Sequence, residues 1–105
     1  GQGHVLGPHE IQPFSFEGDA GDAMTRVIAM LMQQGNCHIA VNRPDYVHAE
    51  FTSDKLGFVD DVEFLLSQAE QVIHVRSASR LGLSDFGVNR ARIEALREAF
   101  DEADD

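Results

Sequence analysis

The fold is decided by residues 46–78, YVHAEFTSDKLGFVDDVEFLLSQAEQVIHVRSA. Segments at 46–52, 58–66 and 72–78 are rich in β-branched and aromatic residues, which is typical of β-strands. Two short, turn-rich breaks separate these segments, and breaks of this length connect antiparallel neighbours. The stretch therefore predicts a three-stranded β-meander.

If both breaks close symmetrically, the register of the three strands follows. Two apolar rows then cross the sheet: Val47, Phe64 and Ile73 in one, and Ala49, Val62 and Val75 in the other. Because side chains alternate between the two faces of a sheet, a slip of one residue would turn these groups to water, whereas a slip of two would preserve the faces. We expect this apolar side to form the core.

The opposite side of the sheet is expected to be polar. The same register places six residues there in two adjacent rows: Glu50, Asp61 and Arg76, and His48, Glu63 and His74. Cross-strand neighbours of this kind are close enough to interact. We call this surface the polar sheet face.

A helix is expected before the meander. Apolar residues between Ala20 and Leu31 recur at helical spacing, Asp19 is the predicted N-cap, and Gly35 is a stop signal. One face of this helix is therefore expected to pack on the apolar side of the sheet.

Three further elements complete the predicted fold. A strand at 11–16 is confined to an edge by Pro13, another strand is expected at 37–41, and a second helix at 88–102. The result is an α+β two-layer sandwich of order β-α-β-β-β-β-α, an antiparallel meander sheet with two helices on one face.

The connection between 37–41 and 46–52 leaves two registers open. A three-residue loop would turn three residues to the core: Cys37, Ile39 and Val41. It would also set His38 beside Glu50, whereas a tighter turn would reverse the faces. We favour the longer loop because it buries the apolar residues.

Length and composition limit the possible functions. The 105 residues suit one domain at 11–102, with a flexible lead-in at 1–10 and an acidic tail at 103–105.

A net charge of −10 repels phosphate backbones, so we expect no nucleic-acid partner. No apolar run reaches the roughly 18 residues of a membrane span, so we expect no direct membrane insertion. Cys37 is the single cysteine, which excludes an internal disulfide.

Three segments carry a family resemblance. They are YVHAEFTS (46–53), GFVDDVEFLL (57–66) and VIHVRSASRLGLSDFGVNRARIEALR (72–97), and they resemble domain-of-unknown-function family 1499, an uncharacterised family of bacteria and plants. The resemblance supports the predicted fold and implies no particular activity. Many members look exported or membrane-anchored, so it implies that the full-length protein is exported or anchored, although the residues themselves do not identify a compartment.

The first candidate site binds an anion or a small ligand. Eight residues near the end of the last strand and the start of the second helix would form it: Arg76, Ser77, Ser79, Arg80, Ser84, Asp85, Asn89 and Arg92. Guanidinium groups, hydroxyls and a helix N-terminus are the donors that anion sites use. In the alternative interpretation, Ser84, Asp85 or Asn89 caps the helix, and the arginines pair with carboxylates.

The second candidate is a metal site. His48, Glu63 and His74, aligned in one row, would supply the two imidazoles and one carboxylate typical of iron(II) or zinc sites. Glu50 and Asp61 would provide a further ligand or orient a histidine. In the alternative interpretation, the acidic central strand and its basic neighbours form a charge-compensated solvent face.

Two carboxylate pairings suggest further contacts. Glu50 opposite Asp61 brings two like charges together, which should raise one pKa, whereas Arg76 in the same row would keep Asp61 ionised. The alternation of side chains turns Asp60 towards the core side, and it is expected at the sheet margin, where it would meet Arg80.

The sequence contains no glycine-rich phosphate loop and no nucleophile elbow.

These patterns favour a non-catalytic binding or interaction module with an unidentified small ligand or protein partner. We expect no cofactor, and an enzyme is not the favoured interpretation. One alternative is a metal-dependent enzyme that uses the His48, Glu63 and His74 cluster. A second alternative is a structural accessory protein of a membrane-associated system.

Overall fold

The computed structural model describes residues 11–53, 57–80 and 86–102, with the side chains of α2 described from Arg90 onward. The elements in chain order are β1 (Phe14–Ser15), α1 (Ala20–Met32), β2 (Cys37–Arg43), β3 (Tyr46–Thr52), β4 (Val59–Ser67), β5 (Val72–Ser79) and α2 (Phe86–Glu102). This order confirms the predicted β-α-β-β-β-β-α arrangement.

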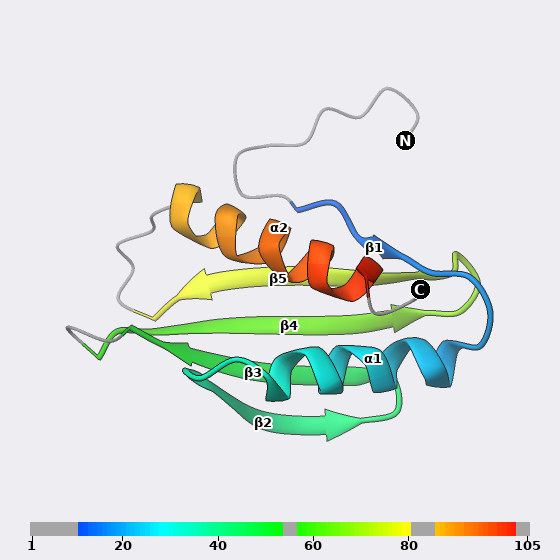
Figure 1. Cartoon of the computed structure of the whole chain (residues 1–105), viewed down its shortest axis with the longest axis horizontal. Coiled ribbons are helices and arrows are strands. Elements are labelled where there is room, and N and C mark those ends of the chain that lie inside the picture. The colour runs from blue at the N-terminus through cyan, green and yellow to red at the C-terminus, as the bar shows by residue number, and fades with distance from the viewer. Residues whose placement is uncertain (1–10, 54–56, 81–85, 103–105) are drawn as a thin grey trace.

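The strands form one antiparallel sheet in the order β1-β5-β4-β3-β2. Both helices cover the same face of the sheet, α2 over the β5 side and α1 over the β3 side (Figure 1). The architecture is therefore the predicted two-layer α+β sandwich. Neither helix of the described chain is both long and apolar enough to cross a bilayer.

The core lies between the sheet and the helices. Among the described residues, nine side chains from both layers are completely buried: Val27, Leu31, Val47, Ala49, Val62, Phe64, Ile73, Ile93 and Phe100. Phe14 of β1 joins the layers, because its ring centroid lies 6.1 Å from that of Phe64 and 5.3 Å from that of Phe100. Burying each large apolar side chain stabilises the fold by about 1.5–3 kcal/mol.

Polar contacts fix the helices and the chain before β1. The Asp22 amide donates to the Asp19 side chain at 2.9 Å, so Asp19 is the N-cap of α1 as predicted. Arg26 of α1 donates to the carbonyl of Phe100 at 2.7 Å and thereby ties the two helices together. Arg97 of α2 donates to the carbonyls of Gln12 and Pro13 at 2.8 and 2.9 Å. This last contact holds the segment before β1 against α2.

The register between β3 and β4 agrees with the prediction. Val47 pairs with Phe64, and Ala49 pairs with Val62. Alternation then places these apolar residues on the helix side and their neighbours on the polar sheet face.

The register between β4 and β5 differs from the prediction by two residues. Phe64 pairs with Val75 instead of Ile73. The turn contains residues 68–71, one residue later along the chain than the symmetric closure around 67–70 that the prediction assumes, and Gln71 adopts a left-handed conformation with φ 55°. Displacing a turn by one residue changes each cross-strand pairing by two residues. Because the shift is an even number of residues, each side chain keeps its predicted face but changes its partner.

The β2–β3 hairpin combines the two registers that the sequence left open. Its turn is tight, because Arg43 pairs with Tyr46, but the register shifts at a bulge between Ile39 and Val41. Before the bulge, His38 pairs with Glu50 as predicted. After it, Val41 lies opposite a residue of the polar sheet face, so the expectation that Val41 faces the core was wrong.

Candidate functional site

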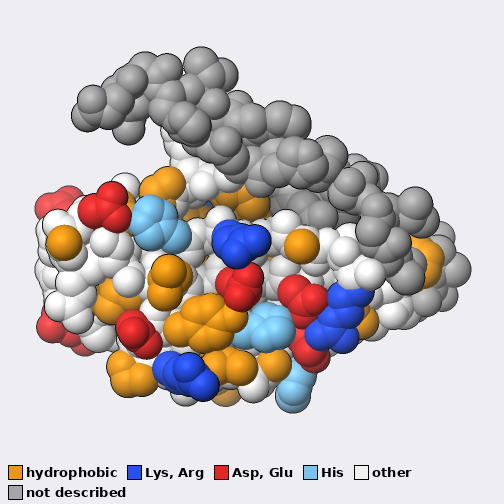
Figure 2. Space-filling view, turned by 180° about the vertical axis from the view of Figure 1, so that it is seen from behind, with side chains coloured by type: hydrophobic (Ala, Val, Ile, Leu, Met, Phe, Trp, Pro, Cys, Tyr) orange, Lys and Arg blue, Asp and Glu red, His pale blue; other side chains and the backbone are white. Residues whose placement is uncertain are grey.

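The candidate site lies on the polar sheet face, the side of the sheet away from the helices. Figure 2 shows this side, where charged and histidine side chains are interspersed with hydrophobic ones. Besides the residues predicted for it, the alternation of the strands brings further residues to this face, among them Tyr46, Leu65 and Ala78. Arg80 follows directly after β5 and reaches the same surface.

Arg80 joins two carboxylates of this face. Its guanidinium donates to Asp61 through Nε and Nη2, both at 2.9 Å, and Nη2 also donates to Glu50 at 2.5 Å. His48 Nε2 lies 2.7 Å from Asp61 Oδ1. The hydrogen bonds from Arg80, followed by that from His48, hold the pKa of Asp61 below its usual value.

The predicted role of Arg76 in this row was therefore wrong. Asp61 pairs with Ala78 across the strands, and Arg80 supplies the cation that compensates the facing carboxylates. The cause is the position of the turn, one residue later than predicted, which shifts the pairing by two residues and places Arg76 opposite Glu63.

The row of His48, Glu63 and His74 is not formed. His74 lies opposite Leu65, and its Nε2 is 3.0 Å from a carboxylate oxygen of Glu70. The register shift thus removes one of the two imidazoles that the predicted metal site requires.

A different set of three residues is close enough to share a metal ion. His48, Glu50 and Asp61 each offer a ligand atom, and these atoms lie within 4.8 Å of one another. The guanidinium of Arg80 is hydrogen-bonded to both carboxylates of this set. A metal ion would therefore have to compete with a cation supplied by the protein.

Glu63 and Arg76 form the centre of the face. The Tyr46 hydroxyl donates to Glu63 Oε2 at 2.5 Å, and this hydrogen bond raises the pKa of Tyr46. Arg76 faces Glu63 in the register and is exposed, yet within 11–53, 57–80 and 86–102 no hydrogen bond or ion pair engages its guanidinium. Glu63 Oε1 likewise has no hydrogen-bond partner among those residues.

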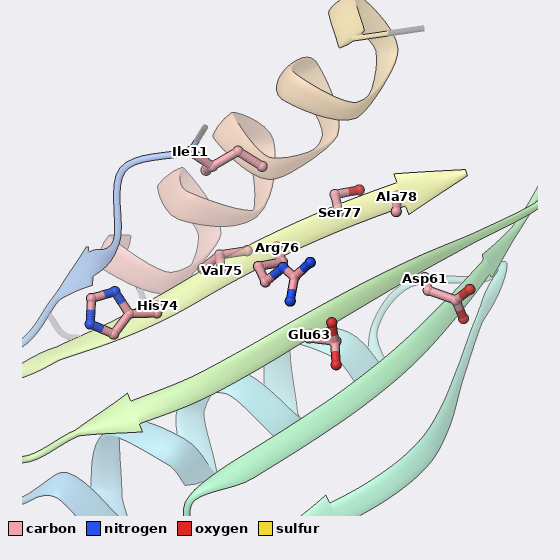
Figure 3. Close-up of a pocket in the computed structure, with 8 residues that line it drawn as sticks. All are labelled: Ile11, Asp61, Glu63, His74, Val75, Arg76, Ser77 and Ala78. Atoms are coloured by element: carbon pink, nitrogen blue, oxygen red, sulfur yellow. The ribbon is translucent and has the colours of Figure 1, made fainter. Parts of the chain in front are cut away.

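These groups line a depression at the β5 side of the face. It has a volume of about 600 Å³ and is lined by Ile11, Asp61, Glu63, His74, Val75, Arg76, Ser77 and Ala78 (Figure 3). A second hollow of about 120 Å³ adjoins it and is lined by Tyr46, Glu63, Leu65, His74 and Arg76. Glu63, His74 and Arg76 line both, so they are the residues that a ligand on this face would meet.

The structure separates the predicted anion-binding residues. Arg76 and Ser77 line the depression, whereas Arg80 is bound by carboxylates. Arg92 lies on the helix side of the sheet, where it donates to Asp60 at 2.8 Å.

Asp60 therefore meets Arg92, and the expected contact with Arg80 was wrong. The guanidinium of Arg92 packs over the ring of Phe51, 5.0 Å from its centroid, and the Arg92–Asp60 pair is mostly shielded from solvent. Ser79 pairs with Asp60 across the strands on this side. The remaining three predicted positions lie outside the described residues or have undescribed side chains: Ser84, Asp85 and Asn89.

Among the residues of the site that were missed in the sequence, Tyr46 and Ile11 differ in the sequence signal that was available. Tyr46 lies two residues before His48 on the same strand. The alternation of side chains alone would therefore have placed its hydroxyl on the polar sheet face. No pattern in the sequence indicates that Ile11 belongs to the site. Its position follows from the contacts that Arg97 makes with the chain before β1.

Comparison with known proteins identifies a family. A family model described as "Protein of unknown function (DUF1499)" matches residues 7–100. No curated protein and no solved structure matches the chain. Since the match spans most of the chain and agrees with the resemblance of the strand segments, the protein belongs to the DUF1499 family of proteins of unknown function.

Proposed function

We propose that this protein is a non-catalytic binding module that takes a small anionic ligand on its polar sheet face, with Arg76 as the anchor. The observation that carries the proposal is the guanidinium of Arg76, which is exposed in the depression and not engaged by any residue of the described chain. Guanidinium presents several donors in a planar fork that matches carboxylate and phosphate oxygens.

The surroundings of Arg76 favour a small ligand over a polymer. Asp61 and Glu63 line the same depression, and the chain carries a net charge of −10. A long polyanion would meet this negative field along its whole length, whereas a single anionic group would meet it only in the depression, where Arg76 supplies a positive charge. The depression volume of about 600 Å³ is within the range of small-molecule sites.

The carboxylates of the face support binding rather than acid–base chemistry. Arg80 and His48 lower the pKa of Asp61, which makes this carboxylate a weak base near neutral pH. His48 contacts Asp61 through Nε2, but no described hydroxyl or thiol forms a hydrogen bond with its other ring nitrogen. The arrangement therefore lacks the activated nucleophile that a His–Asp pair serves in hydrolases.

A thermal-shift series tests the proposal. Acetate, phosphate and sulfate at millimolar concentration should raise the Tm of the wild type, because a ligand that binds only the folded state stabilises it. Arg76→Gln should lose this response. Arg90→Gln removes the same charge from an exposed position on α2 and should keep it. An unchanged response of Arg76→Gln would contradict the proposal.

A metal-dependent enzyme is the second candidate, and the proximity of His48, Glu50 and Asp61 supports it. One imidazole and two carboxylates suit iron(II), manganese or zinc. Metal analysis of protein purified without chelator tests this candidate. Stoichiometric metal that disappears in His48→Ala would favour it, whereas metal-free wild-type protein that also fails to take up added metal would exclude it.

A further inference from the structure

Glu63 and Arg76 carry opposite charges and face each other across two strands. Such pairs lie within side-chain reach and can form an ion pair. Here no ion pair joins them, because Glu63 turns towards the Tyr46 hydroxyl. Among the described residues, Arg76 keeps all its donors and Glu63 Oε1 keeps its acceptor capacity. One positive and one negative group are thus presented side by side.

A ligand with only a carboxylate would use half of this arrangement. Its charge would bind Arg76 but would also lie close to Glu63 and Asp61, which line the same depression. A ligand that also carries an ammonium group would place that group on Glu63 Oε1 and remove the repulsion. The charge pattern therefore favours a zwitterion over a simple anion.

Part of the wall of the site is apolar. Ile11 and Ala78 line the depression, and Leu65, which is 50% exposed, lines the adjoining hollow. Arg97 holds the two residues after Ile11 through their backbone carbonyls, so this wall has a fixed support. An aliphatic side chain on the ligand would cover this apolar surface.

We infer that the depression binds an α-amino acid zwitterion with an aliphatic side chain, its carboxylate on Arg76 and its ammonium group on Glu63. This inference rests on the proposed function, since it names the class of ligand that the anion-binding site would take. Both charged groups of such a ligand are attached to one carbon atom, which suits two protein charges from directly opposed residues.

Titrations followed by NMR test the inference with three matched probes. L-Leucine carries both charges, 4-methylpentanoate lacks the ammonium group, and 3-methylbutylamine lacks the carboxylate. We expect the dissociation constant of leucine to be about fivefold lower than that of either analogue, the effect of one additional partly exposed charge-assisted hydrogen bond. Glu63→Gln should remove the advantage over 4-methylpentanoate, and Arg76→Gln the advantage over 3-methylbutylamine. Arg90→Gln should change neither.

The possible outcomes separate the inference from the proposal on which it rests. If 4-methylpentanoate binds as tightly as leucine and Arg76→Gln weakens both, the anion site stands and the zwitterion inference is overturned. If no probe shifts the resonances of the polar sheet face and the anion panel also gives no response, both are overturned. Binding of glycine as tight as that of leucine would overturn the aliphatic part.

Discussion

Arg80 binds Asp61 in a bidentate arrangement, with Nε on one carboxylate oxygen and Nη2 on the other, both at 2.9 Å. Together with the contact to Glu50, this places a cation between two facing carboxylates. The contact has consequences for the stability of the protein at acid pH and for metal binding.

Asp61→Asn should lower the free energy of unfolding at neutral pH more than at acid pH. Because the folded pKa of Asp61 lies below its usual value, the unfolded chain takes up the proton first as the pH falls. The contribution of this carboxylate is therefore complete above the unfolded pKa of about 3.9 and is lost as the pH falls through the folded pKa. Urea denaturation at about pH 7 and about pH 2.5 measures the difference.

Glu17→Gln is the control for this prediction, because Glu17 is exposed and lies outside the Arg80 network. It should change stability little at either pH. An equal loss of stability for Asp61→Asn at both pH values would show that its charge is not the relevant property.

Arg80→Ala should create a stronger metal site. The substitution leaves His48, Glu50 and Asp61 with ligand atoms within 4.8 Å of one another and removes the competing guanidinium. Calorimetric titration with Zn²⁺ should show tighter binding to the variant than to the wild type. Adding His48→Ala to the variant should remove the gain, and equal zinc affinity in wild type and variant would refute the prediction.

Phe14→Ala should lower the free energy of unfolding by about 3–5 kcal/mol, the usual loss for a large aromatic side chain in a core. Phe14 is 1% exposed and packs on rings from both layers. Phe58→Ala is the matched control, because Phe58 is 41% exposed and should lose much less. Chemical denaturation measures both, and similar losses would mean that Phe14 does not join the layers as described.

Asp19→Ala should cost about 1 kcal/mol, because it removes the side-chain acceptor for the Asp22 amide at the start of α1. Asp19→Asn keeps an acceptor oxygen in the same place and should retain most of the stability. The comparison of the two variants by urea denaturation therefore isolates the capping hydrogen bond from the mere loss of a side chain. Equal losses in both variants would argue against it.

The sequence predicted faces better than partners. The Val47–Phe64 pairing followed from a break that closes symmetrically, but the turn at 68–71 lies one residue later than the symmetric closure around 67–70 that was assumed. Alternation has a period of two, so it cannot distinguish a register from one shifted by two residues. This shift removed His74 from the predicted metal row and brought Arg76 opposite Glu63.

Contacts between layers were also beyond the sequence. The alternation of side chains predicted which side of the sheet Asp60 faces. Its pairing with Arg92, however, depends on where α2 crosses the sheet. Arg80 was predicted to belong to an anion site, with pairing to carboxylates as the alternative interpretation, and the structure pairs it with Glu50 and Asp61. Local patterns therefore specify which side a residue faces, whereas long side chains choose their partners only after the layers have packed.

The bulge in β2 has a consequence for the molecule in concentrated solution. β2 is the terminal strand of the sheet, and its outer backbone edge is a potential template for a strand of another molecule. The irregularity between Ile39 and Val41 interrupts the regular spacing of backbone donors and acceptors along that edge. A neighbouring chain would be able to align with only a few of them, so the bulge protects the protein against edge-to-edge aggregation.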